Sequence, residues 1–171
     1  MVRVLVLTGA PGAGKSSVLE ALSTLLEIED VAHGAIESEE LSRGYPPLEG
    51  EPWLAQLAAV LATQREAGRR LFLIVATTET GAQLSGVLEV AGAERSLTVC
   101  LRAPAEELAA RLERREPERW PGKPGLIAHA RELERVIPAL PGVELTIDTS
   151  GRNAEAVARE VLAAMRAREL L

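Results

Sequence analysis

Residues 9–16, with the sequence GAPGAGKS, are the part of the chain whose residue types and spacing point most directly to chemistry. They match the pattern G-x-x-x-x-G-K-S/T at every defined position. Glycines let such a segment turn tightly and bring successive backbone N–H groups against phosphate oxygens. Lys15 then reaches the β- and γ-phosphates of a nucleotide, and the hydroxyl of Ser16 ligates Mg²⁺. The segment therefore predicts a phosphate-binding loop with Lys15 in a catalytic role.

The expected nucleotide contacts of this loop are Gly9, Pro11, Gly12, Ala13, Gly14, Lys15, Ser16 and Ser17. The alternative is a chance glycine turn that joins a strand to a helix. The surroundings favour the phosphate loop, because an apolar run at residues 2–7 directly precedes it and an amphipathic pattern at residues 16–27 follows it.

The composition limits the kinds of protein that this chain can be. Its 171 residues are 47% hydrophobic, which suffices for one domain with a substantial core. A net charge of −6 argues against a protein that binds duplex nucleic acid. The single cysteine, Cys100, excludes an internal disulfide and a cysteine-rich zinc site. Since no apolar run reaches the roughly 20 residues that cross a bilayer, we expect a soluble, cytoplasmic protein without membrane or nucleic-acid partners.

Short apolar runs alternate with helical patterns from one end of the chain to the other. The predicted strands are residues 2–7, 31–36, 71–76, 97–101 and 143–147. The predicted helices begin near residues 16, 51, 80, 104, 126 and 153, with Thr80 and Gln83 as a capping box and Asn153 as an N-cap. This alternation predicts parallel βαβ units and a three-layer α/β domain, with helices on both faces of the sheet.

The chain resembles the small P-loop kinases, a group that includes shikimate, gluconate, nucleoside and adenylate kinases and chloramphenicol phosphotransferase. The phosphate loop, the chain length and an arginine-rich segment after the fourth predicted strand carry this resemblance. It implies a single P-loop NTPase domain over residues 1–171, with a five-stranded parallel sheet in the order 2-3-1-4-5. It also implies a mobile lid at about residues 114–125, ATP and Mg²⁺ as cofactors, and phosphoryl transfer to a small molecule.

Two glutamates follow the second predicted strand, where the resembling kinases often carry aspartates that orient and deprotonate the acceptor hydroxyl. In an extended segment, Glu37 and Glu39 would lie on the same side of the chain. The acceptor oxygen must lose a proton as it attacks the γ-phosphorus, so we expect Glu39 to be the catalytic base. The resemblance implies a metal-binding role for Glu37 together with Ser16. The alternative is an exposed acidic loop that caps a helix at Leu41.

An arginine-rich segment occupies the predicted lid region. Arg111 and Arg115 are four residues apart and share one helix face. The resemblance implies that an arginine near position 111 stacks on adenine and that later arginines close over the phosphates. We therefore expect Arg111 and Arg115 to bind the nucleotide and Arg119 to act in catalysis. The alternative is ordinary salt bridging with the neighbouring glutamates.

Two more loops at the carboxyl ends of predicted strands are candidates. In the resembling kinases the loop after the last strand runs beside adenine, so Ser150 is an expected nucleotide contact; a plain turn explains it equally well. The third predicted strand is followed by Thr77 and Glu79 and lacks the aspartate that hydrolytic P-loop ATPases usually place there. Both residues lie where ligands bind in parallel sheets, and a helix-capping turn is the alternative.

These patterns predict an ATP-dependent phosphotransferase that acts on a small hydroxyl compound. One alternative is a regulatory nucleotide-binding protein with little turnover, which the missing aspartate motifs favour. Another is a nucleoside triphosphate hydrolase, which the missing aspartate after the third predicted strand disfavours. Arg43 is one of few cations near the predicted acceptor region, which favours a neutral or basic acceptor over an anionic one. His129 stands alone in the sequence, and we expect a surface or structural role for it.

Overall fold

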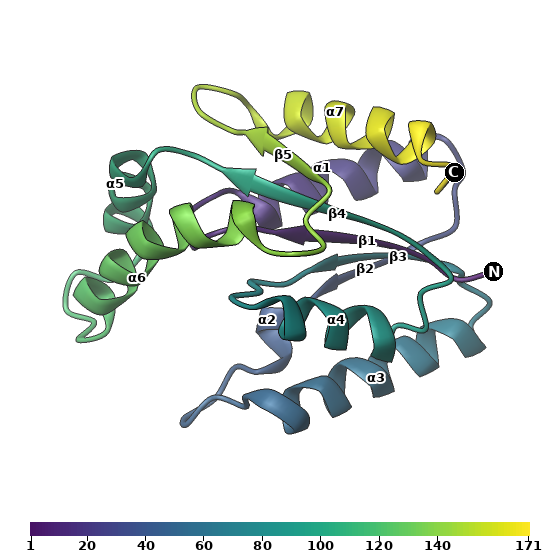
Figure 1. Ribbon diagram of the computed structural model, residues 1–171, viewed down its shortest axis with the longest axis horizontal. Helices are drawn as coiled ribbons and strands as arrows, with labels where there is room; N and C mark the ends of the chain where they lie inside the picture. The colour runs from purple at the N-terminus through teal and green to yellow at the C-terminus, as the bar shows by residue number, and fades with distance from the viewer.

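A sheet of five parallel strands runs through the centre of the computed structural model, which describes residues 1–171 (Figure 1). The strands are β1 (Arg3–Thr8), β2 (Gly34–Glu37), β3 (Leu71–Val75), β4 (Arg95–Arg102) and β5 (Leu145–Asp148). Their order across the sheet is β2-β3-β1-β4-β5, which confirms the order that the resemblance implied.

The central strands are apolar throughout because helices cover both faces of the sheet. Leu5 of β1 pairs with Leu73 of β3 on one side and with Leu97 of β4 on the other. All five residues of β3 are buried, as are the last five of β1. A continuous apolar run rather than an alternating one is typical of such doubly covered parallel strands.

Two pairs of helices form the outer layers (Figure 1). One layer contains α1 (Lys15–Ile28) and α7 (Ala154–Ala167), which contribute Leu22, Leu26 and Val161 to the larger apolar core. The opposite layer contains α3 (Gly50–Glu66) and α4 (Gly81–Val90), which pack in a separate core that includes Leu57 and Leu84. None of the helices combines the length and the apolar composition that a membrane-spanning segment requires.

The helices α5 (Ala105–Arg115) and α6 (Lys123–Val136) pack against each other at the end of the sheet toward which the strands point (Figure 1). Their contact has an apolar cluster of its own, made by Ala109, Leu112, Ile127 and Ala130. A 3₁₀ turn (Ile137–Ala139) follows α6, and a four-residue helix, α2 (Ser38–Leu41), follows β2 directly.

The predicted helix caps are confirmed. Thr80 and Gln83 form a reciprocal capping box at α4, and Asn153 accepts a hydrogen bond from the N–H of Ala156 at 2.8 Å. The segment expected to be a lid is more regular than its prolines and glycines suggested. Since α5 ends at Arg115 and α6 begins at Lys123, only residues 116–122 lie outside helices.

Candidate active site

The phosphate-binding loop joins β1 to α1 at the carboxyl end of the sheet. Gly9 has φ +140°, and a Cβ atom at this position would collide with the carbonyl oxygen of Leu101, so only glycine fits here. No side chain caps the N-terminus of α1. The first N–H groups of this helix therefore stay available to phosphate, at the positive end of the helix dipole.

Lys15 is buried beneath this loop, with 6% of its surface exposed. Its Nζ donates to the carbonyl oxygens of Gly9 at 2.9 Å and Ala10 at 3.3 Å. Burial lowers the pKa of Lys15, and the carboxylates of Glu39 and Glu37 oppose that effect. The lysine is thus held inside the loop, within reach of the space where phosphates would lie.

Glu39 lies beside Lys15, but on a short helix and not on the extended segment that the sequence predicted. The extended segment expected around residues 37–39 is wrong, because α2 begins at Ser38 and Glu39 lies in its first turn. This helix starts early because the hydroxyl of Ser38 donates to the carbonyl of Val75 at 2.5 Å and anchors the turn on β3. Its N-terminal turn is also a favourable place for a negative charge.

The carboxylate of Glu39 has a defined position. Its Oε1 accepts hydrogen bonds from the N–H of Thr77 at 2.9 Å and from the hydroxyl of the same residue. The same oxygen is 3.9 Å from Nζ of Lys15. Glu39 is therefore a partly exposed carboxylate that is fixed next to the phosphate loop.

Glu37 closes β2 next to Ser16. Burial raises its pKa, and the nearby hydroxyl of Ser16 partly opposes that rise. Its Oε1 is buried and lacks a hydrogen-bond partner. An orphaned carboxylate oxygen beside a hydroxyl fits a hard cation such as Mg²⁺, which takes one or two protein oxygens and completes its shell with phosphate and water. No group of three or more His, Cys, Asp and Glu side chains converges in the structure.

Arg111 joins α5 to the phosphate loop. Its Nη1 donates to the carbonyl oxygen of Gly12 at 3.1 Å and to the hydroxyl of Thr149 at 3.1 Å, and its Nη2 pairs with Glu107. Thr149 in turn donates to the carbonyl of Ala13 at 3.1 Å. These contacts form one wall of a cavity of about 370 Å³ beside the loop. The cavity is lined by Gly12, Ala13, Gly14, Ser17, Val18, Arg111, Arg115, Thr149, Arg152, Ala154 and Val157.

A second cavity, of about 480 Å³, lies on the other side of the loop. It is lined by Pro11, Gly12, Gly14, Lys15, Ser16, Ser17, Glu39, Thr77, Glu79, Arg115, Leu126 and His129. The structure thus brings together most of the residues predicted from the phosphate loop. Arg115 lines both cavities.

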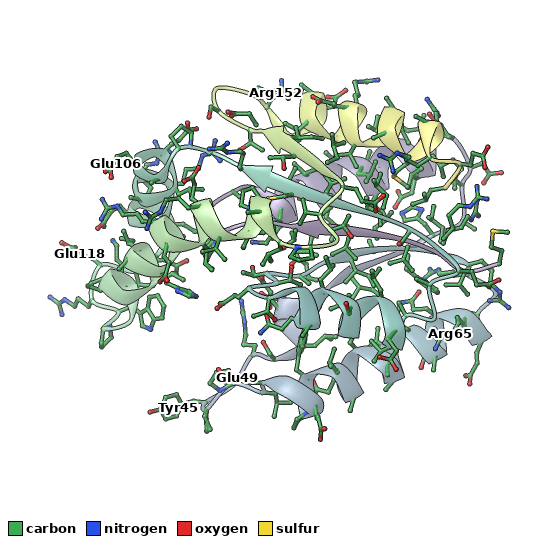
Figure 2. All side chains as sticks on the ribbon, in the orientation of Figure 1. Tyr45, Glu49, Arg65, Glu106, Glu118 and Arg152 are labelled. Atoms are coloured by element: carbon green, nitrogen blue, oxygen red, sulfur yellow. The ribbon has the colours of Figure 1, made fainter.

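A third cavity, of about 530 Å³, adjoins the second through a shared wall of Glu39, Thr77 and Glu79. Its remaining lining is Ser42, Pro47, Leu48, Glu49, Gly50, Trp53 and Gln83. In Figure 2 the side chains of Arg152, from the first cavity, and Glu49, from the third, lie on opposite sides of the molecule. The three cavities therefore form a series, with the phosphate loop between the outer two.

Four predicted residues do not line these cavities, namely Gly9, Glu37, Arg119 and Ser150. Arg119 lies in the connection between α5 and α6 and lines a separate surface hollow with Trp120. Ser150 donates its N–H to Oδ1 of Asp148 at 2.7 Å and does not line the first cavity, whereas its neighbour Thr149 does. The separate position of Arg119 follows from where α5 ends, since three residues lie between it and that helix.

His129 is a site residue that the sequence did not reveal. Its Nε2 is 2.7 Å from Oε1 of Glu79, so α6 contacts the loop after β3 at the edge of the second cavity. That loop is itself held in place, because the hydroxyls of Thr8 and Thr78 are 2.9 Å apart. The histidine is 50 residues from its partner and has no motif around it, so no local pattern could have identified it.

The comparisons with known proteins agree with this geometry. The AAA domain family matches residues 5–125, which is more than half of the chain. No curated protein sequence is similar enough to count as a match.

Several solved structures share the fold across almost their whole length. A sugar kinase from Janibacter sp. HTCC2649 is 20% identical, with a TM-score of 0.69 and coverage of 95% of this chain and 94% of that one. A gluconokinase from Sinorhizobium meliloti 1021 is 23% identical, with a TM-score of 0.67 and coverage of 98% and 94%. An APS kinase from Mycobacterium tuberculosis, solved with AMPPNP and APS, is 18% identical, with a TM-score of 0.63 and coverage of 96% and 98%.

These likenesses confirm the resemblance to the small P-loop kinases at the level of the fold. The order of the strands, the helices on both faces of the sheet and the loop between β1 and α1 agree with it. The chain has the P-loop kinase fold and belongs to the AAA domain family.

Proposed function

We propose that the protein transfers the γ-phosphoryl group of ATP to a hydroxyl group of a small molecule. The observation that carries this proposal is the shared wall of the second and third cavities. On one side of Glu39 lies the phosphate loop with Lys15, and on the other lies a space large enough for a second substrate. A protein that only bound or hydrolysed a nucleotide would have no need for that space.

The nucleotide would occupy the first two cavities. Its phosphates would meet the N–H groups of the loop and Nζ of Lys15, and its nucleoside would lie near Arg111 and Thr149. Ser16 and Glu37 would hold Mg²⁺, which neutralises the charge of the β- and γ-phosphates when it is bound. The kinase solved with AMPPNP supports ATP as the nucleotide for this fold.

In the transfer step, Glu39 would accept the proton of the acceptor hydroxyl. The acceptor oxygen then forms a bond to the γ-phosphorus as the bond from that phosphorus to the β–γ bridging oxygen breaks, and ADP leaves. Lys15 and Arg115 would stabilise the negative charge on the transferred group, because both line the same cavity.

The connection between α5 and α6 would serve as a lid, within residues 114–125. Leu108 of α5 and Leu133 of α6 belong to the larger core, so the movement would be confined to the connection and the helix ends beside it. Closure would bring Arg119 toward the phosphates and exclude water from the transfer step. The cytoplasmic location expected from the sequence stays a prediction.

The decisive test is ADP production from MgATP, with and without a panel of nucleosides, sugars, sugar acids and hydroxylated antibiotics. Lys15→Ala should abolish both ATP binding and ADP production. The control is Arg69→Ala, an exposed residue beside the amino end of β3, which should leave both unchanged.

Acceptor-stimulated ADP that is lost in Lys15→Ala establishes the kinase. ADP that forms equally without any acceptor contradicts the proposal and indicates a hydrolase. ATP binding with no ADP under any condition contradicts it in favour of a regulatory protein.

A further inference from the structure

We propose that the acceptor carries a protonated amine as well as the hydroxyl that is phosphorylated, as an amino sugar or an amino alcohol does. This inference rests on the proposed function, because it takes the third cavity to be the acceptor site. That cavity is defined by its volume of about 530 Å³ and by its contact with the phosphate side, independently of its charge. Its volume lies within the range of small-molecule sites, about 300–1,000 Å³.

The charge of the lining is what selects the acceptor. Glu39, Glu49 and Glu79 line the cavity, and neither lysine nor arginine does. An acceptor with a carboxylate or phosphate of its own would meet three carboxylates and no cation in the lining itself. Like charges this close are repulsive in a partly enclosed space, whereas an ammonium group would be attracted.

Two of the three carboxylates have a basic group beside them, since Nζ of Lys15 is 3.9 Å from Glu39 and Nε2 of His129 is 2.7 Å from Glu79. Arg43 lies near the cavity in sequence, but its Nη2 is 2.7 Å from Oε1 of Glu40. Lys15 donates to the carbonyls of its own loop and would turn to phosphate when a nucleotide binds. His129 contacts Glu79 from the phosphate side and does not line the third cavity. Glu49 is therefore the carboxylate of the lining whose negative charge has no partner.

Glu49 is the carboxylate best placed for the amine. It is exposed at the start of α3 and forms no ion pair, in contrast to Glu39 and Glu79 (Figure 2). Trp53, one turn further along α3, lines the same cavity, and its Nε1 is fixed by donation to the carbonyl of Ser38 at 2.9 Å. An acceptor could place its hydroxyl at Glu39, its carbon skeleton against the indole and its amine at Glu49.

The experiment compares compounds that share a skeleton and differ in charge. Glucosamine, glucose and glucuronate are offered with MgATP, and kanamycin serves as a larger polycationic probe. We expect kcat/KM to rank cationic over neutral over anionic, with about fivefold or more between steps. Binding of kanamycin in the presence of AMPPNP is measured by calorimetry as a readout that does not depend on turnover. Its affinity should fall as salt is added.

Glu49→Gln should weaken kanamycin binding about fivefold and lower the ratio of kcat/KM for glucosamine to that for glucose by a similar factor. The matched control is Glu51→Gln, two residues away in the first turn of α3 and outside the cavity lining, which should change neither. Glu49→Lys should reverse the ranking of the charged sugars.

The outcomes separate this inference from the proposed function. Phosphorylation of glucose or glucuronate in preference to the cationic compounds overturns the inference and leaves the kinase intact. Kanamycin binding that depends on Glu49, with no ADP from any acceptor, supports the inference about charge and overturns the kinase. If kanamycin neither binds nor is phosphorylated, or if Glu49→Gln and Glu51→Gln behave alike, the inference is wrong.

Discussion

Nζ of Lys15 lies 3.9 Å from Oε1 of Glu39, so the phosphate loop and the acceptor cavity meet at one ion pair. The lysine comes from the first turn of α1. The glutamate comes from the first turn of α2, which is bonded to the end of β3 through Ser38 and Val75. Because Glu39 also accepts two hydrogen bonds from Thr77, its carboxylate stays in place when the lysine turns to phosphate. This arrangement makes Glu39 a fixed group between two substrates.

Glu39→Gln should therefore reduce turnover far more than nucleotide affinity. The amide can still accept the hydrogen bonds of Thr77 but cannot take a proton from the acceptor. We expect kcat to fall by about a hundredfold, the usual contribution of a general base, and the Kd of ATP to change by less than about threefold. Steady-state kinetics and calorimetry measure the two effects. Glu40→Gln, on the same short helix and paired with Arg43, is the control and should behave like the wild type. Equal losses in kcat and affinity would show that Glu39 organises the site and is not its base.

Glu37→Gln should change how stability depends on pH. Burial raises the pKa of Glu37 in the folded protein above its ordinary value of 4.5. The folded state therefore binds more protons than the unfolded state between these two pKa values, so stability falls as pH rises through that window. The variant should show a flatter plot of Tm against pH above the ordinary pKa of 4.5. Glu20→Gln, exposed on α1, should retain the wild-type slope. Identical slopes for all three proteins would contradict the burial of this carboxylate.

The parts of the fold that the sequence predicted are those with a local pattern. The apolar run of β3 and the cap at Asn153 each depend on a few consecutive residues, and the structure has both. The sheet order came from the resemblance, since no local pattern specifies which strands are neighbours. The same distinction explains the segment after β2, where a hydrogen bond from Ser38 to Val75, 37 residues away, starts a helix in place of the expected extended chain.

In the candidate site, too, some residues can be recognised from a local sequence pattern and others depend on contacts between distant parts of the chain. The phosphate loop can be recognised from consecutive residues of the sequence, because the same short segment determines both the backbone conformation and the side chains that the loop requires. The pairing of His129 with Glu79 and of Arg111 with Thr149 joins residues 50 and 38 positions apart. Arg111 was expected on α5, but its partner Thr149 was not, because a lone threonine after a strand has many uses.

Arg111→Ala should weaken ATP binding by about tenfold, or about 1.4 kcal/mol, because the variant removes the guanidinium that holds Gly12 and Thr149 together in the wall of the nucleoside cavity. The carbonyl of Gly12 and the hydroxyl of Thr149 would lose their donor, so the phosphate loop should also become more mobile. Calorimetry with ATP measures the first effect and amide hydrogen exchange of residues 9–16 the second. The control is Arg114→Ala, which is exposed on the same helix and lines neither nucleotide cavity. Equal affinities of the two variants for ATP would remove Arg111 from the nucleotide site.

Gly9→Ala and Gly125→Ala should have opposite effects on stability. At Gly9 a methyl group would collide with the carbonyl oxygen of Leu101, and the φ of +140° is unfavourable for any side chain. At Gly125, in the first turn of α6, a methyl group meets no atom within 4 Å. We expect Gly9→Ala to lower the free energy of unfolding by about 1–3 kcal/mol and to impair ATP binding, since the loop must move away from β4. Gly125→Ala should raise the free energy of unfolding by about 0.5 kcal/mol, because alanine loses less backbone entropy in a helix. Urea unfolding followed by circular dichroism measures both changes. A Gly9→Ala protein with wild-type stability and ATP affinity would mean that this close approach between the loop and β4 does not shape the phosphate site.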